Sequence, residues 1–454
     1  MIIGVMMFNV VFALGEMALM YPVSGGFYIY VSRFVDPSWG FAMGWNYCLQ
    51  WITILPFEVV VASFTVDYWT NGSVNPAVFI TVFLVALVII SCFGGLGYAE
   101  EEFWSSFLKL TAIITFLIIG LVCVLGGGPE SGDFNTYQGA KLWYEPGAFN
   151  NGFKGFCSVF VTAAFAFSGT ELTLPSACKQ VFWRVTLFYI LSLFFVGLLV
   201  RSDDPNLIGN KVFANSQASP FVLVGKYANI VGYDHFINAV IMVSVISIGL
   251  SGVYGGSRTL TALAEQNYAP KIFAYVDRAG RPLFSTILIL VFGCLAYAGV
   301  DQKTSSTGSW RFPGLAALFT WGSICLAHIR FRAAWKRQGH TLDEIPFRAA
   351  FGVVGSYIGL GMAILVFIAQ TYVAISPVGE RLNTAEGFFQ SMLALFVVLF
   401  SWAVGYIWKR PKFLSLDDVD LDSGRREIDW EMQRAIDDKK KNAGAFMRVI
   451  YFLF

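Results

Sequence analysis

Residues 153–172 read FKGFCSVFVTAAFAFSGTEL, a run of about 20 mostly apolar residues that is long enough to cross a bilayer as a helix. The run ends in Ser168-Gly169-Thr170-Glu171, where a glycine between two hydroxyl residues permits the helix to unwind. Unwinding frees backbone amides and carbonyls at membrane depth, which is tolerable only where these groups line a cavity. The stretch therefore predicts a membrane helix that is broken beside a cavity.

The composition around this run is that of a membrane protein. Of the 454 residues, 56% are hydrophobic and only 13% are charged, whereas about 25% of the residues in soluble domains are charged. This balance excludes a soluble enzyme, a disordered protein and a nucleic-acid binder that relies on a basic patch. The seven cysteines have no C-x-x-C spacing, and the three histidines lie in different segments. We therefore expect no metal site, no cofactor, no catalytic cluster and no enzyme activity.

The apolar runs predict an all-α polytopic membrane protein. A transmembrane domain is expected over residues 1–408, followed by a charged cytoplasmic tail over 409–454. About eleven spans are predicted, at 1–20, 41–68, 77–95, 104–125, 153–172, 185–200, 236–262, 283–300, 312–329, 350–375 and 387–408.

Lys and Arg indicate the orientation, because they are more frequent in short cytoplasmic loops. They gather in alternate connections, at Arg33; Lys179 and Arg184; Lys271, Arg278 and Arg281; Arg330, Arg332, Lys336, Arg337 and Arg348; and the tail from Lys409. The sequon Asn71-Gly72-Ser73 falls on the opposite side and agrees with this orientation. An odd number of spans then places Met1 outside, so we expect one helix and a cytoplasmic leader to be missing.

Ionisable residues inside the spans are candidates for function, because charge is costly in a bilayer. Asp67 and His328 are expected to be solvated at the membrane interfaces. Glu16 has two open interpretations, a structural hydrogen-bonding role and a gating role. Glu58 follows Pro56, which removes a backbone donor; its carboxylate either binds a cation or proton, or satisfies the backbone disturbed by Pro56.

The break at Ser168-Gly169-Thr170 also has two interpretations. The ends of two half-helices offer opposite partial charges, which suit a small zwitterion whose carboxylate meets amides and whose ammonium meets carbonyls. Serine, glycine and threonine also occur where membrane helices simply pack closely.

Several motifs resemble the amino acid permeases of fungi, in the amino acid–polyamine–organocation superfamily. The resemblance covers nearly the whole chain. It rests on residues 14–26 (LGEMALMYPVSGG), 35–47 (VDPSWGFAMGWNY), 167–171 (FSGTE), 179–184 (KQVFWR), 319–325 (FTWGSIC) and 328–332 (HIRFR).

This resemblance implies a fold of twelve helices, with two inverted repeats of five helices and two trailing helices. About eleven of the twelve are expected here, since the family's first helix, which carries a Gly-rich unwound segment, is absent. Two further departures are a shortened connection after Glu171 and a Ser/Thr-rich insert near residues 301–312.

The resemblance also implies the site residues. Ser168, Gly169 and Thr170 would hold the backbone of the substrate beside Glu171, and Phe167 would form a hydrophobic lid. Thr320 and Ser323, about one helical turn apart, would select the side chain of the substrate.

Lys109 would carry the coupling proton, because relatives in the superfamily have a lysine on the fifth helix where sodium-driven relatives bind a cation. Glu58 and Glu171 are alternative carriers of this proton. A structural interpretation of Lys109 also remains open, since its stem allows the ammonium to snorkel to the headgroups.

The resulting hypothesis is a secondary active transporter that imports amino acids across the plasma membrane by proton symport with alternating access. Its partners would be an amino acid, protons and the lipid bilayer, with no nucleic acid. The alternative hypothesis is a non-transporting membrane sensor or scaffold, or an inactive truncated permease.

Overall fold

The regular structure of this chain is helical in the computed structural model, which describes residues 1–22, 26–70, 72–147, 149, 151–172, 178–208, 219–300, 311–379, 381–411, 414–426 and 444. The side chains of residues 172, 178–186, 205 and 311 lie outside this description. Asn71 of the sequon, most of the connection after Glu171 and the insert at 301–310 also lie outside it. Within the described ranges there is no β-strand.

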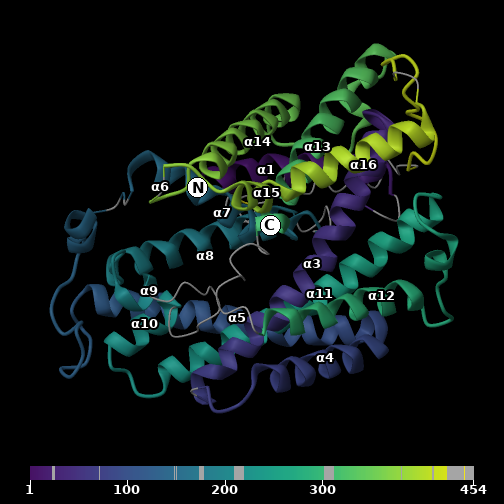
Figure 1. The fold of residues 1–454 in the computed structure, drawn as a ribbon. Coiled ribbons are helices and arrows are strands. Elements are labelled where there is room, and N and C mark those ends of the chain that lie inside the picture. The colour runs from purple at the N-terminus through teal and green to yellow at the C-terminus, as the bar shows by residue number, and fades with distance from the viewer. Residues whose placement is uncertain are drawn as a thin grey trace.

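The helices follow one another along the chain through short connections (Figure 1). The first half contains α1 (Ile2–Met20), α2 (Tyr28–Phe34), α3 (Pro37–Thr70), α4 (Pro76–Cys92), α5 (Gly94–Val124), η1 (Trp143–Gly147), α6 (Gly152–Ser158), α7 (Phe160–Phe167), η2 (Thr170–Leu172) and α8 (Cys178–Leu199). The second half contains α9 (Pro205–Ile208), α10 (Pro220–Tyr227), α11 (Tyr233–Glu265), η5 (Lys271–Ala274), α12 (Leu283–Gly293), η6 (Cys294–Gly299), α13 (Arg311–Arg337), η8 (Leu342–Glu344), α14 (Gly352–Ile375), α15 (Ala385–Ser391) and α16 (Leu393–Lys409).

Every one of the eleven predicted runs coincides with helical structure, so the prediction of an all-α polytopic membrane protein is confirmed. Among the described residues, six helices are long and apolar enough to cross a membrane. The pair α15 and α16, bent by 66°, is long and apolar enough only when the two helices are taken together. The other four runs form shorter apolar segments, at Pro76–Cys92, Gly152–Phe167, Leu187–Leu199 and Leu283–Gly299.

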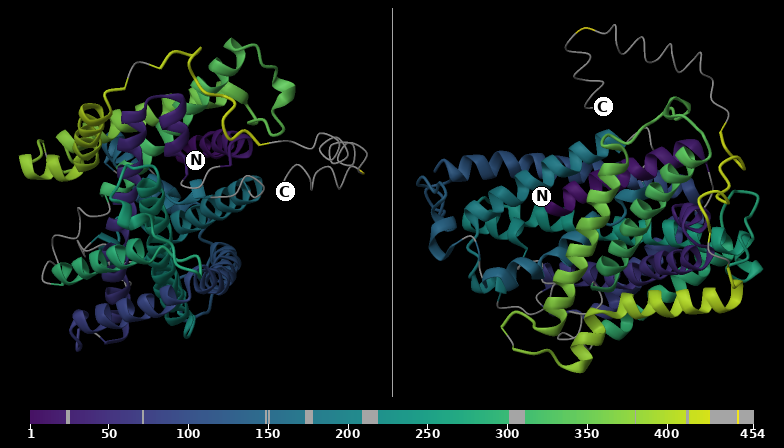
Figure 2. Two further views of the ribbon diagram at one scale, coloured as in Figure 1. Left: turned by 90° about the vertical axis from the view of Figure 1, so that its right-hand side faces the viewer. Right: turned by 90° about the horizontal axis from the view of Figure 1, so that it is seen from above.

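The long helix α3 connects two groups of helices. Figure 1 and the left view of Figure 2 show it running from the group of α1, α13, α14 and α16 to the group of α4, α5, α11 and α12. It packs closely against α11, because Gly255 and Gly256 leave room for the indole of Trp51. A β-carbon on either glycine would approach Trp51 to 3.2 or 3.1 Å, so bulkier residues there would separate the two helices.

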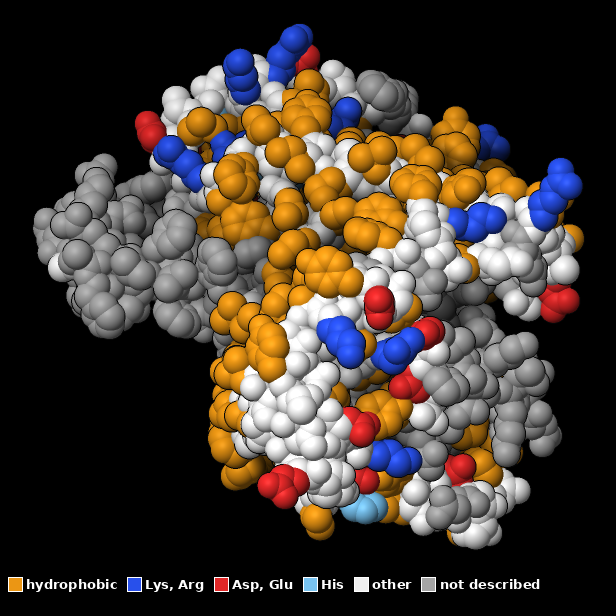
Figure 3. Space-filling view, turned by 90° about the vertical axis from the view of Figure 1, so that its left-hand side faces the viewer, with side chains coloured by type: hydrophobic (Ala, Val, Ile, Leu, Met, Phe, Trp, Pro, Cys, Tyr) orange, Lys and Arg blue, Asp and Glu red, His pale blue; other side chains and the backbone are white. Residues whose placement is uncertain are grey.

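The outer surface is largely apolar, as expected for helices that face lipid. Exposed hydrophobic residues follow one side of α4 (Val78, Val82, Val85, Ile89) and of α14 (Val354, Ile358, Leu365, Ile368). Figure 3 shows a broad area of hydrophobic side chains across the upper part of one face, with Lys and Arg above it and a mixed charged area below it.

A buried ionic cluster joins α1, α13 and the segment before α14. The carboxylate of Glu16 lies 3.0 Å from Nε2 of His328, accepts from Nη2 of Arg332 at 2.9 Å and accepts from the amide of Ala349 at 2.7 Å. The other imidazole nitrogen of His328 contacts the hydroxyl of Ser356. The expectation that His328 is solvated is therefore wrong, because it is fully buried against Glu16. These contacts favour the structural interpretation of Glu16.

The described part of the tail, residues 414–426, forms a strap across the ends of α1, α2 and α13. The hydroxyl of Tyr21 donates to the carbonyl of Leu421 at 2.7 Å, and the amide of Arg426 donates to the carbonyl of Met20 at 2.9 Å. Further contacts join Arg33 to Asp420, Arg330 to the carbonyl of Leu414, Arg337 to Asp417 and Arg425 to Glu344. The strap thus lies at the end of the molecule where these basic residues gather.

We predict that docking of the strap weakens in acid. The amide of Thr341 and the neighbouring Arg425 and His340 lower the pKa of Glu344 to about 2 from an ordinary value near 4.5. Of these partners only Arg425 belongs to the strap, because Thr341 and His340 lie in the same turn as Glu344. The ionised carboxylate therefore stabilises the docked state through Arg425; this contribution is complete above about pH 4.5 and is lost as the pH falls toward 2. Hydrogen exchange of the strap amides, corrected for intrinsic rates, should therefore accelerate between these pH values.

The matched control is Glu344→Gln, which cannot titrate and should remove the Glu344-dependent part of this acceleration. An identical pH profile in the variant would show that Glu344 does not contribute to docking.

Candidate functional site

The chain unwinds where α7 ends. Ser168 has extended backbone angles (φ −60°, ψ 139°), and Gly169 has a positive φ of 93°. The hydroxyl of Thr170 donates to the carbonyl of Phe167 at 2.7 Å, so it satisfies one of the groups freed at the helix end. A positive φ is accessible to glycine without steric cost, which explains why the helix opens at this residue.

The carboxylate of Glu171 accepts hydrogen bonds from the backbone amide that the break exposes. Its two oxygens lie 3.2 and 3.1 Å from the amide nitrogen of Gly169, which donates to them. The indole N–H of Trp321 on α13 donates to the same carboxylate at 3.3 Å. Glu171 is only 6% exposed, so the end of α7 and the middle of α13 are joined through one buried acid.

Helix α3 supplies the remaining polar wall. The amide of Gln50 donates to the hydroxyl of Ser168 at 2.6 Å, and Asn46 donates to the carbonyl of Ala316 on α13 at 3.0 Å. Three buried polar atoms in this region have no hydrogen-bond partner among the described residues: Oδ1 of Asn46, Oε1 of Gln50 and Oγ1 of Thr320. The hydroxyl of Tyr47 interacts with Glu171 and with the indole of Trp51. Buried polar groups are normally paired, so this concentration is typical of a binding site for a polar molecule.

The other predicted substrate residues are placed differently. The ring of Phe167 stacks on Tyr189 of α8, with centroids 5.1 Å apart. Ser323 accepts from the indole of Trp39 at 2.9 Å and lines an apolar groove between α13 and α14. Ser323 and Trp321 are two positions apart, about 200° around the helix. Since Trp321 contacts Glu171, Ser323 faces away from the break.

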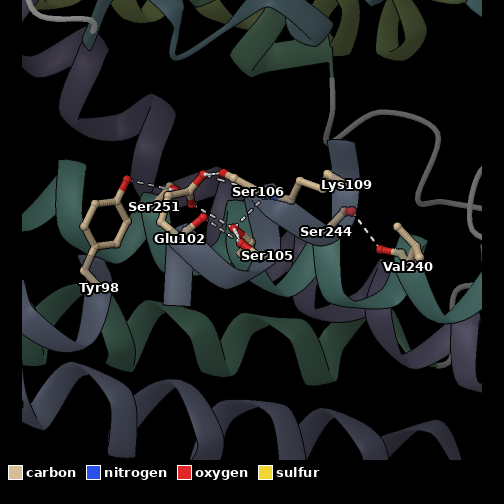
Figure 4. Close-up of polar contacts among 9 residues, drawn as sticks. Tyr98, Glu102, Ser105, Ser106, Lys109, Val240, Ser244 and Ser251 are labelled. Carbon is tan, nitrogen blue, oxygen red and sulfur yellow. Dashed lines mark hydrogen bonds and ion pairs between the residues drawn. The ribbon is translucent and has the colours of Figure 1, made fainter. Parts of the chain in front are cut away.

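Lys109 belongs to a second polar region, between α5 and α11 (Figure 4). Its ammonium donates to the hydroxyl of Ser247 on α11 at 2.9 Å and lies 3.9 Å from the carboxylate of Glu102. The hydroxyl of Ser247 donates to Glu102 at 2.8 Å, and Ser105 lies 3.0 Å from the same hydroxyl.

Lys109 lies farther along its helix than the predicted span indicated. The predicted run at 104–125 placed Lys109 about one and a half turns from the helix start. Helix α5 instead begins at Gly94, so Lys109 lies about four turns, or about 22 Å, along it. Its ammonium bonds to the neighbouring helix, which is not the geometry of a snorkelling side chain.

Glu58 lies elsewhere, on the side of α3 that faces α11. It is 3% exposed, and its Cβ lies 3.7 Å from the position that a β-carbon on Gly249 would occupy. Its carboxylate forms no hydrogen bond or ion pair with another described residue, including the backbone near Pro56. Helix α3 continues through Pro56, so the structure does not support the interpretation that Glu58 repairs a broken turn.

Sequence reasoning missed Trp321, Gln50, Glu102 and Ser247. Trp321 lies inside the motif at residues 319–325. Gln50 is a single amide in an apolar run, which was a usable signal for a polar contact. Glu102 was lost because the predicted span began two residues later.

The chain matches the family of amino acid permeases over residues 1–417. It belongs to this family, and it is therefore a multi-pass membrane protein related to transporters of amino acids.

Three relatives illustrate the similarity. "Amino-acid permease inda1" of Hypocrea atroviridis is 57% identical over 471 residues, which cover 100% of this chain and 82% of the relative. "General amino-acid permease GAP1" of Saccharomyces cerevisiae is 45% identical over 451 residues, covering 94% of this chain and 74% of the relative. "Cationic amino acid transporter 1" of Schizosaccharomyces pombe is 45% identical, covering 93% of this chain and 74% of the relative.

We predict that Gly169→Ala destabilises the protein through the backbone alone. The nearest atom to an added β-carbon would be Cη2 of Trp51 at 3.6 Å, so there is space. The positive φ still costs about 1–2 kcal/mol for a non-glycine residue, which should lower the Tm of the purified protein by about 2 °C. The matched control is Gly361→Ala on α14, where nothing lies within 4 Å and φ is not positive; its Tm should stay equal or rise. Equal shifts in both variants would contradict the prediction.

Proposed function

We propose that this chain is a secondary active transporter that imports amino acids across the plasma membrane by proton symport with alternating access. The observation that carries the proposal is the broken end of α7. There the backbone amide of Gly169 has left the helix and donates to a buried carboxylate. The names of two relatives, a general amino-acid permease and a cationic amino acid transporter, favour an amino acid as the cargo.

The substrate would be held by the break and by Glu171. The carboxylate of the substrate accepts a hydrogen bond from the amide of Gly169, which donates to Glu171 in this structure. Glu171 then pairs with the substrate ammonium, and the substrate carboxylate is held by the hydrogen bond from the Gly169 amide. Ser168 and Thr170 bond to the backbone of the substrate, Phe167 covers it, and Thr320 selects its side chain. Ser323, which the sequence pairs with Thr320, faces Trp39 and is left out of the proposed site. The unpartnered buried oxygen of Thr320 favours a role for this residue.

Proton coupling would use Lys109, with Glu58 as the second titrating group. A charged Lys109 holds α5 to α11 through Ser247, and a neutral Lys109 holds them less strongly, because hydrogen bonds from charged donors are stronger. Since α11 also packs on α3 beside the break, a change at Lys109 can alter access to the substrate.

The proposed orientation places the carboxyl end in the cytoplasm. The strap contacts Arg33, Arg330 and Arg337 at one end of the molecule, and Lys and Arg are enriched on the cytoplasmic side of membrane proteins. Import across the plasma membrane then proceeds toward this end.

We predict that liposomes containing this chain take up amino acids, and that an inward proton gradient accelerates uptake. Lys109→Ala should reduce the acceleration by about tenfold or more and retain exchange of internal for external substrate, because it removes the proton carrier and leaves the break intact. Radiolabelled uptake with and without a protonophore measures both quantities.

The control is Lys154→Arg, which keeps a positive charge at a position outside the contact between α5 and α11. Its uptake should equal that of the unmodified chain. Loss of the acceleration in Glu171→Gln but not in Lys109→Ala would show that Lys109 does not carry the proton. No uptake or exchange of any amino acid, by protein that retains its fold, would favour the sensor or scaffold instead.

We also predict that Thr320→Ala changes substrate preference more than maximal rate. Removing the hydroxyl leaves the break and Glu171 in place, so the change should alter the ratio of uptake rates for polar and apolar amino acids by about tenfold, roughly the value of one hydrogen bond. Competition assays with single amino acids measure this ratio. Ser323→Ala provides the comparison, since Ser323 faces Trp39; an unchanged preference in Thr320→Ala would remove Thr320 from the site.

A further inference from the structure

The polar contacts between α5 and α11 follow one stripe on each helix. On α5 the stripe contains Tyr98, Glu102, Ser105 and Lys109, which recur every three or four residues and so share one face. On α11 it contains Ser247, Ser251 and Tyr254. Tyr98 stacks on Tyr254 with centroids 4.1 Å apart, and Ser247 contacts three of the α5 residues. The stripe is therefore a continuous polar seam from the beginning of α5 to Lys109 (Figure 4).

Within this seam the hydrogen bonds run in one direction. The ammonium of Lys109 donates to the oxygen of Ser247 at 2.9 Å, and the hydroxyl of Ser247 donates to Oε2 of Glu102 at 2.8 Å. The direct distance between Lys109 and Glu102 is 3.9 Å, which is longer than a hydrogen bond. The hydroxyl of Ser247 therefore connects the ammonium of Lys109 to the carboxylate of Glu102 through two hydrogen bonds.

The two ends of this connection differ in position along α5. Glu102 is seven residues nearer the start of the helix, about 10 Å along its axis, and its side chain is 36% exposed against 27% for Lys109. Exposed acidic neighbours continue toward that end, at Glu100. Glu102 is therefore the member of the pair that is better placed to exchange a proton with solvent on the side we propose to be cytoplasmic.

Few other charged groups face the seam. Glu101 also faces the seam: its carboxylate interacts with Ser105 and Ser247 and lies near the charges of Glu102 and Lys109. Helix α4 carries no Asp, Glu, Lys or Arg, and neither do residues 187–199 of α8. On α11 the ionisable residues are Tyr233, Asp234, His235, Tyr254, Arg258 and Glu265. Of these, Tyr254 lies in the seam, and Arg258, about three turns from Ser247, lies over the ring of Tyr254.

We infer that Ser247 and Glu102 form the release path for the proton carried by Lys109. One N–H bond of the Lys109 ammonium breaks and its proton passes to the oxygen of Ser247, while the Ser247 O–H bond breaks and that proton passes to Glu102. The products are a neutral amine and a neutral carboxylic acid, and Ser247 is unchanged. Glu102 then releases the proton to solvent. This inference rests on the proposed proton symport and names its path.

The test compares two serines on the same helix. Ser247→Ala removes the connecting hydroxyl, whereas Ser244→Ala removes a hydroxyl that donates only to its own helix, at the carbonyl of Val240. In liposomes, uptake driven by an inward proton gradient should fall about tenfold or more in Ser247→Ala, relative to substrate exchange, and should be unchanged in Ser244→Ala. Ser247→Thr keeps a hydroxyl and should restore proton-driven uptake.

A second variant keeps the inference falsifiable if Ser247→Ala does not fold. Glu102→Gln cannot accept the proton, so the dependence of uptake on internal pH should flatten, which a purely structural role would not cause. Proton-driven uptake and pH profiles that stay unchanged in both Ser247→Ala and Glu102→Gln overturn the path. Failure of the unmodified chain to respond to a proton gradient, with uptake otherwise present, instead overturns the proposed proton symport.

Discussion

Inside a membrane there is no water to bond to a peptide group that has lost its helical hydrogen bond. The packing around Ser168 and Gly169 depends on this constraint. Two of the peptide groups at the break are satisfied by side chains, and the amide of Ser168 by the carbonyl of Phe165. The amide of Gly169 donates to Glu171, the hydroxyl of Thr170 donates to the carbonyl of Phe167, and the side-chain amide of Gln50 donates to the hydroxyl of Ser168. Gln50 belongs to α3, so the contacts at the break also involve this helix.

The buried acids of this chain differ in how fully they are compensated. Glu16 lies against Arg332, His328 and a backbone amide, and removing the partner of a buried ion pair leaves a buried charge that costs several kcal/mol. Such a fully paired group holds helices together. Glu58 and the pair of Lys109 and Glu102 are less completely paired, so a proton can be gained or lost there with less disruption. This contrast separates the structural acids from the candidates for coupling.

Sequence reasoning located all eleven helical runs because the length of an apolar run is a local property. It misplaced the start of α5, since Gly94, Gly97 and residues 100–102 resemble a polar loop when they are considered alone. These residues form helix because their polar side pairs with α11. His328 was assigned to a solvated interface from its neighbour Arg330, but Glu16, 312 positions earlier in the chain, buries it.

The amino-acid sequence by itself determined a helical membrane protein, its family motifs and the point at which one helix breaks, because apolar length and a glycine between hydroxyl residues act over a few neighbouring positions. The tertiary structure alone decided that Trp321 reaches Glu171, that Ser323 turns away from it, and that Ser247 joins Lys109 to the rest of its seam. The direction of a side chain toward a particular neighbour depends on which helices pack together and at what rotation, and this information is distributed over the whole chain.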